Sequence, residues 1–317
     1  MKFYLAPLEG VTTYNLREKI DKYFPFIDKY YIPFLEPYNN SLKNKHLKEI
    51  DPKNNQVHSQ VVPQIISKDS QNTIWLINEL EKLGYSEVNL NFGCPSRTVT
   101  TKNKGCGILN NLELLDSYLS KIFENTNIKI SVKMRLGLHD TTHFNEILDI
   151  LNKYPLHELI IHPRTGDDQY LGNLKLDLLD NLDKKTKFDI IYNGEIKSQS
   201  DISYIEKRYP FIKGIMLGRG LIERPFLLSN YTNLEIKEKI KSYYYELANE
   251  AVSNYGFGNA KFFLKQLWVY LIKSFDADIK LSKKLFKANT FEEFNDIVNQ
   301  ILMSDIKPEA SGIKKFI

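Results

Sequence analysis

The chain lacks several features that would place it in a specialised class. Two cysteines in 317 residues are too few for a disulfide framework. No stretch of 18 apolar residues occurs, since even the apolar region 262–275 is interrupted by Lys265, Gln266 and Lys273, so we expect no membrane span. Neither charge sign dominates, because 43 Lys and Arg face 39 Asp and Glu. The resulting net charge of +4 permits a polyanionic partner without requiring one.

Internal repeats and low-complexity tracts are also missing. The N-terminus leads from Met1 and Lys2 directly into a mixed segment and lacks the layout of a signal peptide. A chain with 42% hydrophobic and 26% charged residues can bury a full core. We therefore expect a globular protein of the cytoplasm.

Short β-rich runs alternate with longer amphipathic segments over the first 220 residues. Segments 70–83 and 143–154 carry apolar residues at helical spacing. Eight strands separated by helices predict βαβ units that close into a parallel (β/α)8 barrel, the TIM-barrel form of the α/β class; an open doubly wound sheet is the alternative. The predicted strands are 3–6, 28–34, 61–66, 87–91, 129–135, 158–162, 189–192 and 213–217.

After Pro225 the β-rich runs end and only helical patterns follow, over 234–254, 260–275, 282–287 and 291–303. We expect a barrel domain over residues 1–232 and a small all-helical domain over 233–317. Gly256-Phe257-Gly258 follows no strand, so it does not indicate a dinucleotide site.

Unusual polar, glycine and proline residues follow the ends of seven predicted strands. In a parallel barrel the carboxyl ends of all strands meet at one face, which carries the active site. We therefore expect these residues to share one site. They are residues 6–10, Gln64, 91–95, 133–135, 162–165, 193–195 and 218–220.

Two of these loops, 193–195 and 218–220, follow the last two strands, where barrels commonly bind a phosphate through backbone N–H groups. Arg219 can add charge-assisted contacts to the same phosphate. Lys133 and Gln64 can bond the polar edge of a flavin, with Lys133 stabilising negative charge on it.

Cys94 stands in a sharp Gly-Cys-Pro turn directly after a strand. We expect its thiol to reach the cavity, where it can act as a proton donor or a nucleophile. It lies 12 residues from Cys106 with no histidine pair nearby, which misses the spacing of zinc sites, so no metal is expected. His162 and Arg164 leave the sixth strand together and indicate an anionic or carbonyl-rich ligand.

Basic residues also gather in the helical region, where segment 261–287 holds seven lysines against two aspartates. This segment is a candidate surface for a phosphate backbone, although lysine-rich faces also keep ordinary helices soluble.

These motifs together resemble the tRNA-dihydrouridine synthases, flavoenzymes that reduce uridine in tRNA. The resemblance spans the whole chain and rests on Ala-Pro-Leu-Glu-Gly-Val at 6–11, Asn-Phe-Gly-Cys-Pro-Ser at 91–96, Ser-Val-Lys-Met-Arg-Leu-Gly at 131–137, Asn-Gly-Glu-Ile at 193–196 and Gly-Arg-Gly at 218–220. Segments 95–99 and 265–268 are most similar to the bacterial branch that acts on position 16 of the D-loop, which favours U16 over U17 and U20.

The resemblance implies that NADPH reduces FMN, that a hydride reaches C6 of a flipped-out uracil, and that Cys94 protonates C5. It places the expected contacts as follows. FMN would contact Pro7, Leu8, Glu9, Gln64, Lys133, His162, Asn193, Gly194, Glu195, Gly218 and Arg219; uracil would contact Asn91, Arg135 and Arg164; and the tRNA body would contact Lys261, Lys265 and Lys273. Extruding a base costs a few kcal/mol and requires contacts to its Watson–Crick edge.

Two positions depart from the family pattern. Pro163 replaces a small residue and is expected to reshape the approach to His162 and Arg164. Cys106 occupies a small-residue position in a loop expected to close over the substrate, where a second thiol would complicate labelling.

Two other functions remain open from the residues alone. One is an FMN barrel acting on a free pyrimidine, which would not need the helical domain. The other is a tRNA-binding or tRNA-folding protein whose flavin chemistry is incidental, although the presence of Asn91, Cys94 and Lys133 together argues against an inactive enzyme. We expect tRNA as the partner and a monomer.

Overall fold

The computed structural model describes residues 1–313 and forms a closed barrel of eight parallel strands in the order β1 to β8. The predicted barrel is confirmed, and the open-sheet alternative is wrong. Each strand agrees with its predicted bounds to within about one residue. The strands are β1 Lys2–Leu5, β2 Lys29–Leu35, β3 Gln60–Ile65, β4 Glu87–Phe92, β5 Lys129–Arg135, β6 Glu158–His162, β7 Asp189–Asn193 and β8 Gly214–Leu217.

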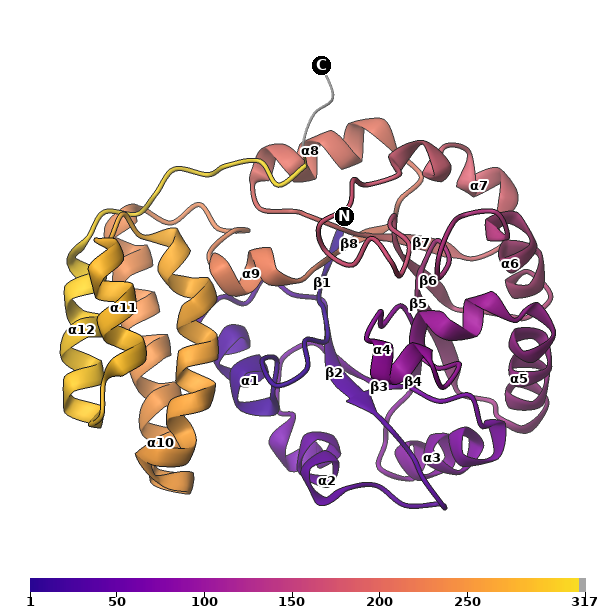
Figure 1. Cartoon of the computed structure of the whole chain (residues 1–317), viewed down its shortest axis with the longest axis horizontal. Helices are drawn as coiled ribbons and strands as arrows, with labels where there is room; N and C mark the ends of the chain where they lie inside the picture. The colour runs from indigo at the N-terminus through magenta and orange to yellow at the C-terminus, as the bar shows by residue number, and fades with distance from the viewer. Residues whose placement is uncertain (314–317) are drawn as a thin grey trace.

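Helices surround the barrel on its outside, and the segments between β-strands contain short 3-10 turns as well (Figure 1). The helices within the barrel region are α1 Tyr14–Tyr23, α2 Asn44–Ile50, α3 Ser70–Lys82, α4 Arg97–Thr100, α5 Leu112–Asn125, α6 Phe144–Leu151, α7 Leu182–Lys185, α8 Gln199–Arg208 and α9 Arg219–Glu223; the 3-10 turns are η1 Pro52–Asn54, η2 Gly105–Asn110 and η3 Leu176–Leu179.

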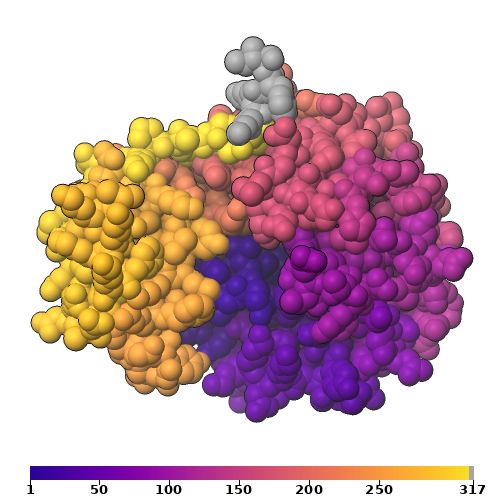
Figure 2. All heavy atoms as spheres, in the orientation of Figure 1, coloured from indigo at the N-terminus to yellow at the C-terminus, as the bar shows by residue number. Residues whose placement is uncertain are grey.

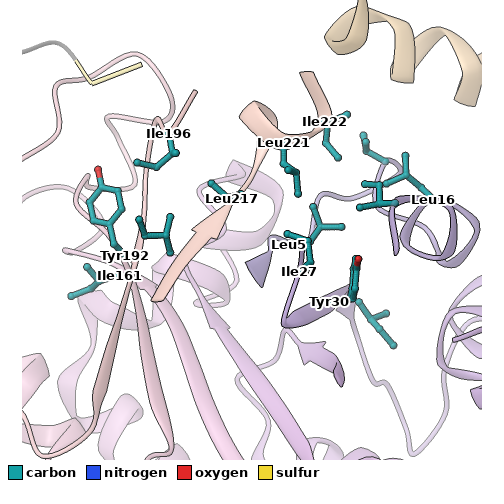
Figure 3. Close-up of a cluster of buried hydrophobic side chains, with 14 of the residues drawn as sticks. Leu5, Leu16, Ile27, Tyr30, Ile161, Tyr192, Ile196, Leu217, Leu221 and Ile222 are labelled. Carbon is teal, nitrogen blue, oxygen red and sulfur yellow. The ribbon is translucent and has the colours of Figure 1, made fainter. Parts of the chain in front are cut away.

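Side chains along each strand point alternately outward to the helices and inward into the barrel, so the buried apolar residues form two separate clusters. Outward-facing apolar side chains of the strands pack against the helices, as Figure 3 shows for Leu5 and Leu217 near Leu221 of α9. Inward-facing residues form a small apolar cluster inside the barrel: Tyr4, Ala6, Tyr31, Val62, Ile160, Ile191 and Met216. Above and below this cluster the inward positions are polar, so the barrel carries polar layers at both ends.

Three further helices follow the barrel: α10 Asn233–Leu271, α11 Ile279–Lys287 and α12 Phe291–Met303, with the 3-10 turn η4 Ile272–Ser274 after α10. They lie together at one side of the barrel, with α10 packed against α1 (Figure 1). The predicted helices 234–254 and 260–275 correspond to the two arms of α10, which meet at a kink where Gly256 has a non-helical backbone, with φ 71° and ψ 156°. Within residues 1–313, no helix has the length and apolar character needed to cross a bilayer.

Candidate active site

A cavity of about 410 Å³ opens at the C-terminal ends of the strands. Figure 2 shows a hollow on this face with N-terminal residues at its floor, between the helical region and the barrel loops. All eleven residues expected to contact FMN line the cavity, together with Cys94, Asn91 and Arg135. Loops distant in sequence therefore meet at the one face where the strands end.

The Cys94 turn is fixed by contacts to its backbone. The backbone N–H groups of Gly93 and Cys94 both donate to Asn91 Oδ1, at 3.0 and 2.9 Å. The Cys94 carbonyl accepts from the backbone N–H of Cys106 at 3.1 Å and from its thiol at 3.2 Å. A Cβ on Gly105, which has φ +56°, would lie 2.6 Å from that carbonyl. The turn therefore has little freedom to move the thiol.

The Cys94 thiol is a weak acid in this setting. Burial raises its pKa, and the Ser96 backbone N–H and the charge of Lys133 offset part of that effect. The group therefore remains protonated at neutral pH, as a proton donor must.

Cys106 differs from its expected place over the substrate. It is fully buried in η2, and burial raises the pKa of its thiol to about 12. A buried, protonated thiol reacts slowly, so we expect Cys106 to interfere little with labelling of Cys94.

A chain of side-chain hydrogen bonds runs from the Cys94 turn into the barrel. Asn91 Nδ2 donates to Gln64 Oε1 at 2.7 Å, and Gln64 Nε2 donates to Asn89 Oδ1 at 2.8 Å. Asn89 Nδ2 then donates to Ser131 Oγ at 2.9 Å, and Ser131 donates to Glu87 Oε1 at 2.8 Å. We call these five residues the amide relay.

Both ends of the amide relay fix its direction. A carboxylate can only accept hydrogen bonds, and the backbone N–H groups at Asn91 can only donate. Rotating any one side-chain amide by 180° would place two N–H groups, or two oxygen atoms, against each other. Each amide nitrogen of Gln64 and Asn91 keeps one N–H beyond those used in the relay, so both residues can present donors to carbonyl oxygens of a ligand.

The relay ends at a buried ionic cluster near the N-terminal ends of the strands. Lys29 Nζ lies 2.8 Å from Glu87 and 2.9 Å from Glu158, and Tyr4 donates to Glu158 at 2.8 Å. Glu87, His157 and Glu158 are close enough together to ligate a metal. The Lys29 ammonium, however, already occupies the position between the two carboxylates, so the cluster is explained by this buried ion pair.

Burial, with a smaller effect of neighbouring charges, lowers the pKa values of Lys133 and His162. Loss of hydration, with a smaller effect of Arg135, lowers the pKa of Lys133 to about 7. Burial and the surrounding Arg and Lys charges hold the pKa of His162 well below its usual value, so its ring is neutral. Arg164 Nη1 lies 3.3 Å from His162 Nε2 and can only donate, which places the ring proton on Nδ1.

The loops after β7 and β8 form a cradle of backbone donors. Within residues 1–313, the backbone N–H groups of Gly194, Glu195, Arg219 and Gly220 find no acceptor in the chain, although all four residues line the cavity. Unpaired backbone N–H groups on residues that line a cavity suit a phosphate. The Glu195 carboxylate lies beside them and accepts from Arg219 at 2.6 Å.

Arg164 and Arg135 are held mainly by protein groups. Arg164 does not line the cavity; it donates to Glu195 at 2.8 Å and to the Gly172 carbonyl at 2.6 Å. The structure thus gives Arg164 a contact to Glu195, and its expected contact to uracil stays a prediction. Arg135 lines the cavity, but its guanidinium already bonds the carbonyls of Gly93, Thr165 and Gln169. His162, which precedes Pro163, lines the cavity.

The three lysines expected on the tRNA-binding face do not share one face, because Lys261 and Lys265 are neighbours on α10 and Lys273 lies apart from them. Lys261 Nζ lies 5.8 Å from the ring of Phe257, and Lys265 donates to the Phe286 carbonyl of α11. Both stand two residues from Phe263, which places them on the opposite side of the helix from the barrel-facing wall. Only Lys273 lies beside Tyr270, which lines the cavity.

Sequence reasoning missed three aromatic residues of the cavity: Phe34, Tyr170 and Tyr270. The ring of Tyr170 lies 4.5 Å from the guanidinium of Arg219 and 5.3 Å from that of Arg135. Its position eight residues after His162 was a usable signal, because it follows the same strand end. Tyr270 comes from α10, and no local pattern shows that this helix reaches the barrel mouth.

The fold and this cavity define a parallel (β/α)8-barrel protein with a polar ligand site at the carboxyl ends of its strands. The chain belongs to the dihydrouridine synthase (Dus) family, whose model matches residues 4–295.

Individual relatives agree with this family. A probable tRNA-dihydrouridine synthase of Helicobacter pylori is 32% identical over 205 residues, 61% of this chain and 60% of that protein. The tRNA-dihydrouridine synthase B of Pasteurella multocida is 28% identical over 50% of this chain and 47% of its own length. The tRNA-dihydrouridine(16) synthase of Vibrio vulnificus is 26% identical over 72% and 73%. The chain thus spans about half to three fifths of the length of the first two relatives.

Among solved structures, the old yellow enzyme homologue of Zymomonas mobilis (NCR) matches with a TM-score of 0.51 at 11% identity, over 72% of this chain and 87% of that one. A variant of the same protein matches over 76% and 90%, with the same TM-score and identity. This likeness concerns the barrel fold alone.

Proposed function

We propose that this protein is a tRNA-dihydrouridine synthase that reduces the C5–C6 double bond of a D-loop uridine, with position 16 as the target. The observation that carries the proposal is the position of the protonated Cys94 thiol. It lies in a turn held by hydrogen bonds and lines a cavity that also has unpaired backbone N–H groups suited to a phosphate. Family membership and the similarity to the Vibrio vulnificus enzyme support the reaction and the position.

The cavity residues fit FMN. The unpaired N–H groups of Gly194, Glu195, Arg219 and Gly220 suit its phosphate. Gln64 and Lys133 stand where the polar edge of the ring would lie, with Pro7, Leu8 and Glu9 along the wall. When bound and reduced by NADPH, FMN supplies the hydride that adds to C6 of the uracil.

The proton comes from the chain itself. Cys94 Sγ donates it to C5, and the thiolate that remains is stabilised by the charges of Lys133 and Arg135. Asn91 holds the Cys94 turn through its Oδ1 and offers its free N–H to a uracil carbonyl. One positioned general acid contributes about 10²–10⁴-fold to rate.

We further propose that residues 1–232 form the catalytic unit and 233–317 the tRNA-binding unit, of which 314–317 lie outside the described residues. The proposed partners are NADPH as reductant and tRNA as substrate, acting on a monomer in the cytoplasm. Lys273, beside the cavity, is the lysine of the three best placed to contact tRNA.

Cofactor affinity should depend on pH through Lys133. Below pH 7 its ammonium is already charged, because its pKa is about 7 in the free protein. A negatively polarised ligand edge raises that pKa, so above pH 7 binding requires proton uptake and affinity should fall by up to about tenfold per pH unit. Fluorescence titration with FMN from pH 6 to 9 measures this, with Lys133→Met as control. Equal pH profiles for the two proteins would contradict the role of Lys133.

Salt dependence of tRNA binding should distinguish the lysines of the helical region. Lys273→Glu should weaken binding and flatten the log–log salt slope by about one unit, because one phosphate contact is lost. Lys261→Glu should change the slope less, since this lysine lies on the far side of α10. Filter binding between about 50 and 200 mM salt measures both. A larger effect of Lys261→Glu would reverse the assigned tRNA-binding face.

The proposed function is tested by incubating the FMN-loaded protein with NADPH and unmodified tRNA, then digesting the RNA to nucleosides. Dihydrouridine should appear only when all three components are present. Its formation from free uridine or uracil at the same rate would favour the free-pyrimidine alternative.

A further inference from the structure

A second cavity of about 490 Å³ lies between the barrel and the helical region. It is bounded by α1 and α2 on one side and by the kinked part of α10 on the other, where Figure 1 shows α10 beside α1. We call it the α1–α10 groove. Its principal lining residues are Tyr14, Asn44, Lys48, Tyr255, Asn259 and Phe263.

The groove is directly adjacent to the catalytic cavity. Glu9 lines the catalytic cavity and Gly10 lines the groove. Consecutive Cα atoms are about 3.8 Å apart, so the two spaces meet at the backbone of Glu9 and Gly10.

The lining combines the chemistry that a nucleotide requires. Tyr255 is 45% exposed although it is a large aromatic residue, and a base can stack on an exposed aromatic ring, of which Lys48 covers one face. The amides of Asn44 and Asn259 can bond the edge of a base. Lys48 Nζ lies 5.6 Å from the centroid of the Tyr255 ring, so a phosphate attached to a stacked base would lie near an ammonium.

The other charges around the groove are already paired. Glu49 accepts from Arg17 at 3.0 Å, and Lys45 donates to Glu9 at 2.8 Å. In the part of the chain that the structure describes, Lys48 forms no ion pair with a carboxylate. The cation that remains free in the groove thus favours an anionic occupant.

We propose that the α1–α10 groove binds a second base of the RNA, a neighbour of the uridine that enters the catalytic cavity, by stacking it on Tyr255 and pairing its phosphate with Lys48. This inference rests on the proposed function. It gives the helical region a task beyond holding the phosphate backbone, since a stacked neighbour helps to keep the target base extruded.

The test measures binding of full tRNA by the FMN-loaded protein, with Tyr255→Ala, Tyr255→Phe and the matched control Tyr204→Ala on α8. Stacking of one base predicts a Kd about five- to a hundredfold higher for Tyr255→Ala. Tyr255→Phe keeps the ring, and Tyr204 lies outside the groove, so both should bind tRNA with about the wild-type Kd. Melting temperature and bound flavin show whether each variant is folded.

A second arm uses tRNA that carries an abasic nucleotide on one or the other side of the target uridine. On one side the abasic substitution should weaken wild-type binding by the same factor as Tyr255→Ala, and should have no further effect in that variant. The proposal would be overturned if Tyr255→Ala bound tRNA with the wild-type affinity, or if the losses of affinity caused by Tyr255→Ala and by the abasic nucleotide were fully additive. The groove would then be a site for a small molecule or another chain. If the wild-type protein forms no dihydrouridine, the proposed function is refuted. The tRNA affinities of wild-type and Tyr255→Ala proteins for intact and abasic tRNA would still test the groove separately.

Discussion

Cys94→Ala is expected to lower kcat for uridine reduction by about 10²–10⁴-fold, because the reaction loses its general acid. The substitution removes only the thiol from a turn held by backbone bonds to Asn91 and Cys106. FMN content, tRNA affinity and the melting temperature should therefore change little. Single-turnover assays with reduced protein and unmodified tRNA measure the chemical step directly.

The matched control for this variant is Cys106→Ser. Cys106 is buried and contributes a hydrogen bond to the Cys94 carbonyl, which a serine hydroxyl can replace. Turnover should stay within about tenfold of the wild-type value, below the effect expected of a general acid. A Cys94→Ala protein with wild-type turnover would show that another group, or water, protonates C5.

Lys29→Met is expected to destabilise the barrel by about 3–5 kcal/mol, since it leaves Glu87 and Glu158 buried without their shared cation. The two carboxylates then repel each other in the barrel interior without a cation between them.

Urea unfolding at neutral pH measures the free energy of unfolding of each variant. Lys2→Met is the control, because Lys2 is exposed on β1 at the same end of the barrel, and its loss should change stability by no more than about 0.5 kcal/mol. Equal stability of Lys29→Met and Lys2→Met would mean that the cluster accommodates the loss, for example by admitting water.

The barrel and its loops could be predicted because their signals are local. Each strand is a short run of β-branched and aromatic residues, and Gly93 and Pro95 mark the turn that carries Cys94. The topology of a parallel barrel then brings the strand ends together without further information. The amide relay also had a local signal, since polar residues recur at every second position, Glu87, Asn89 and Asn91, within a strand buried on both faces.

Contacts between distant segments could not be predicted in this way. Nothing near Arg164 in the sequence shows that Glu195 will bind it, since 31 residues separate them. The sides to which Lys261 and Lys265 point depend on which face of α10 meets the barrel. The groove beside Tyr255 exists only because Gly256 bends α10 while α1 and α2 pack against it.

The central claim is that this chain reduces one D-loop uridine with Cys94 as proton donor. The most direct measurement incubates the FMN-loaded protein and NADPH with unmodified tRNA and maps mass changes by nuclease digestion and mass spectrometry. The addition of two hydrogens predicts a gain of about two daltons at a single D-loop nucleotide, position 16, with the gain nearly abolished in Cys94→Ala. A protein that oxidises NADPH but leaves every tRNA uridine unchanged, or an unaffected Cys94→Ala variant, would contradict the claim.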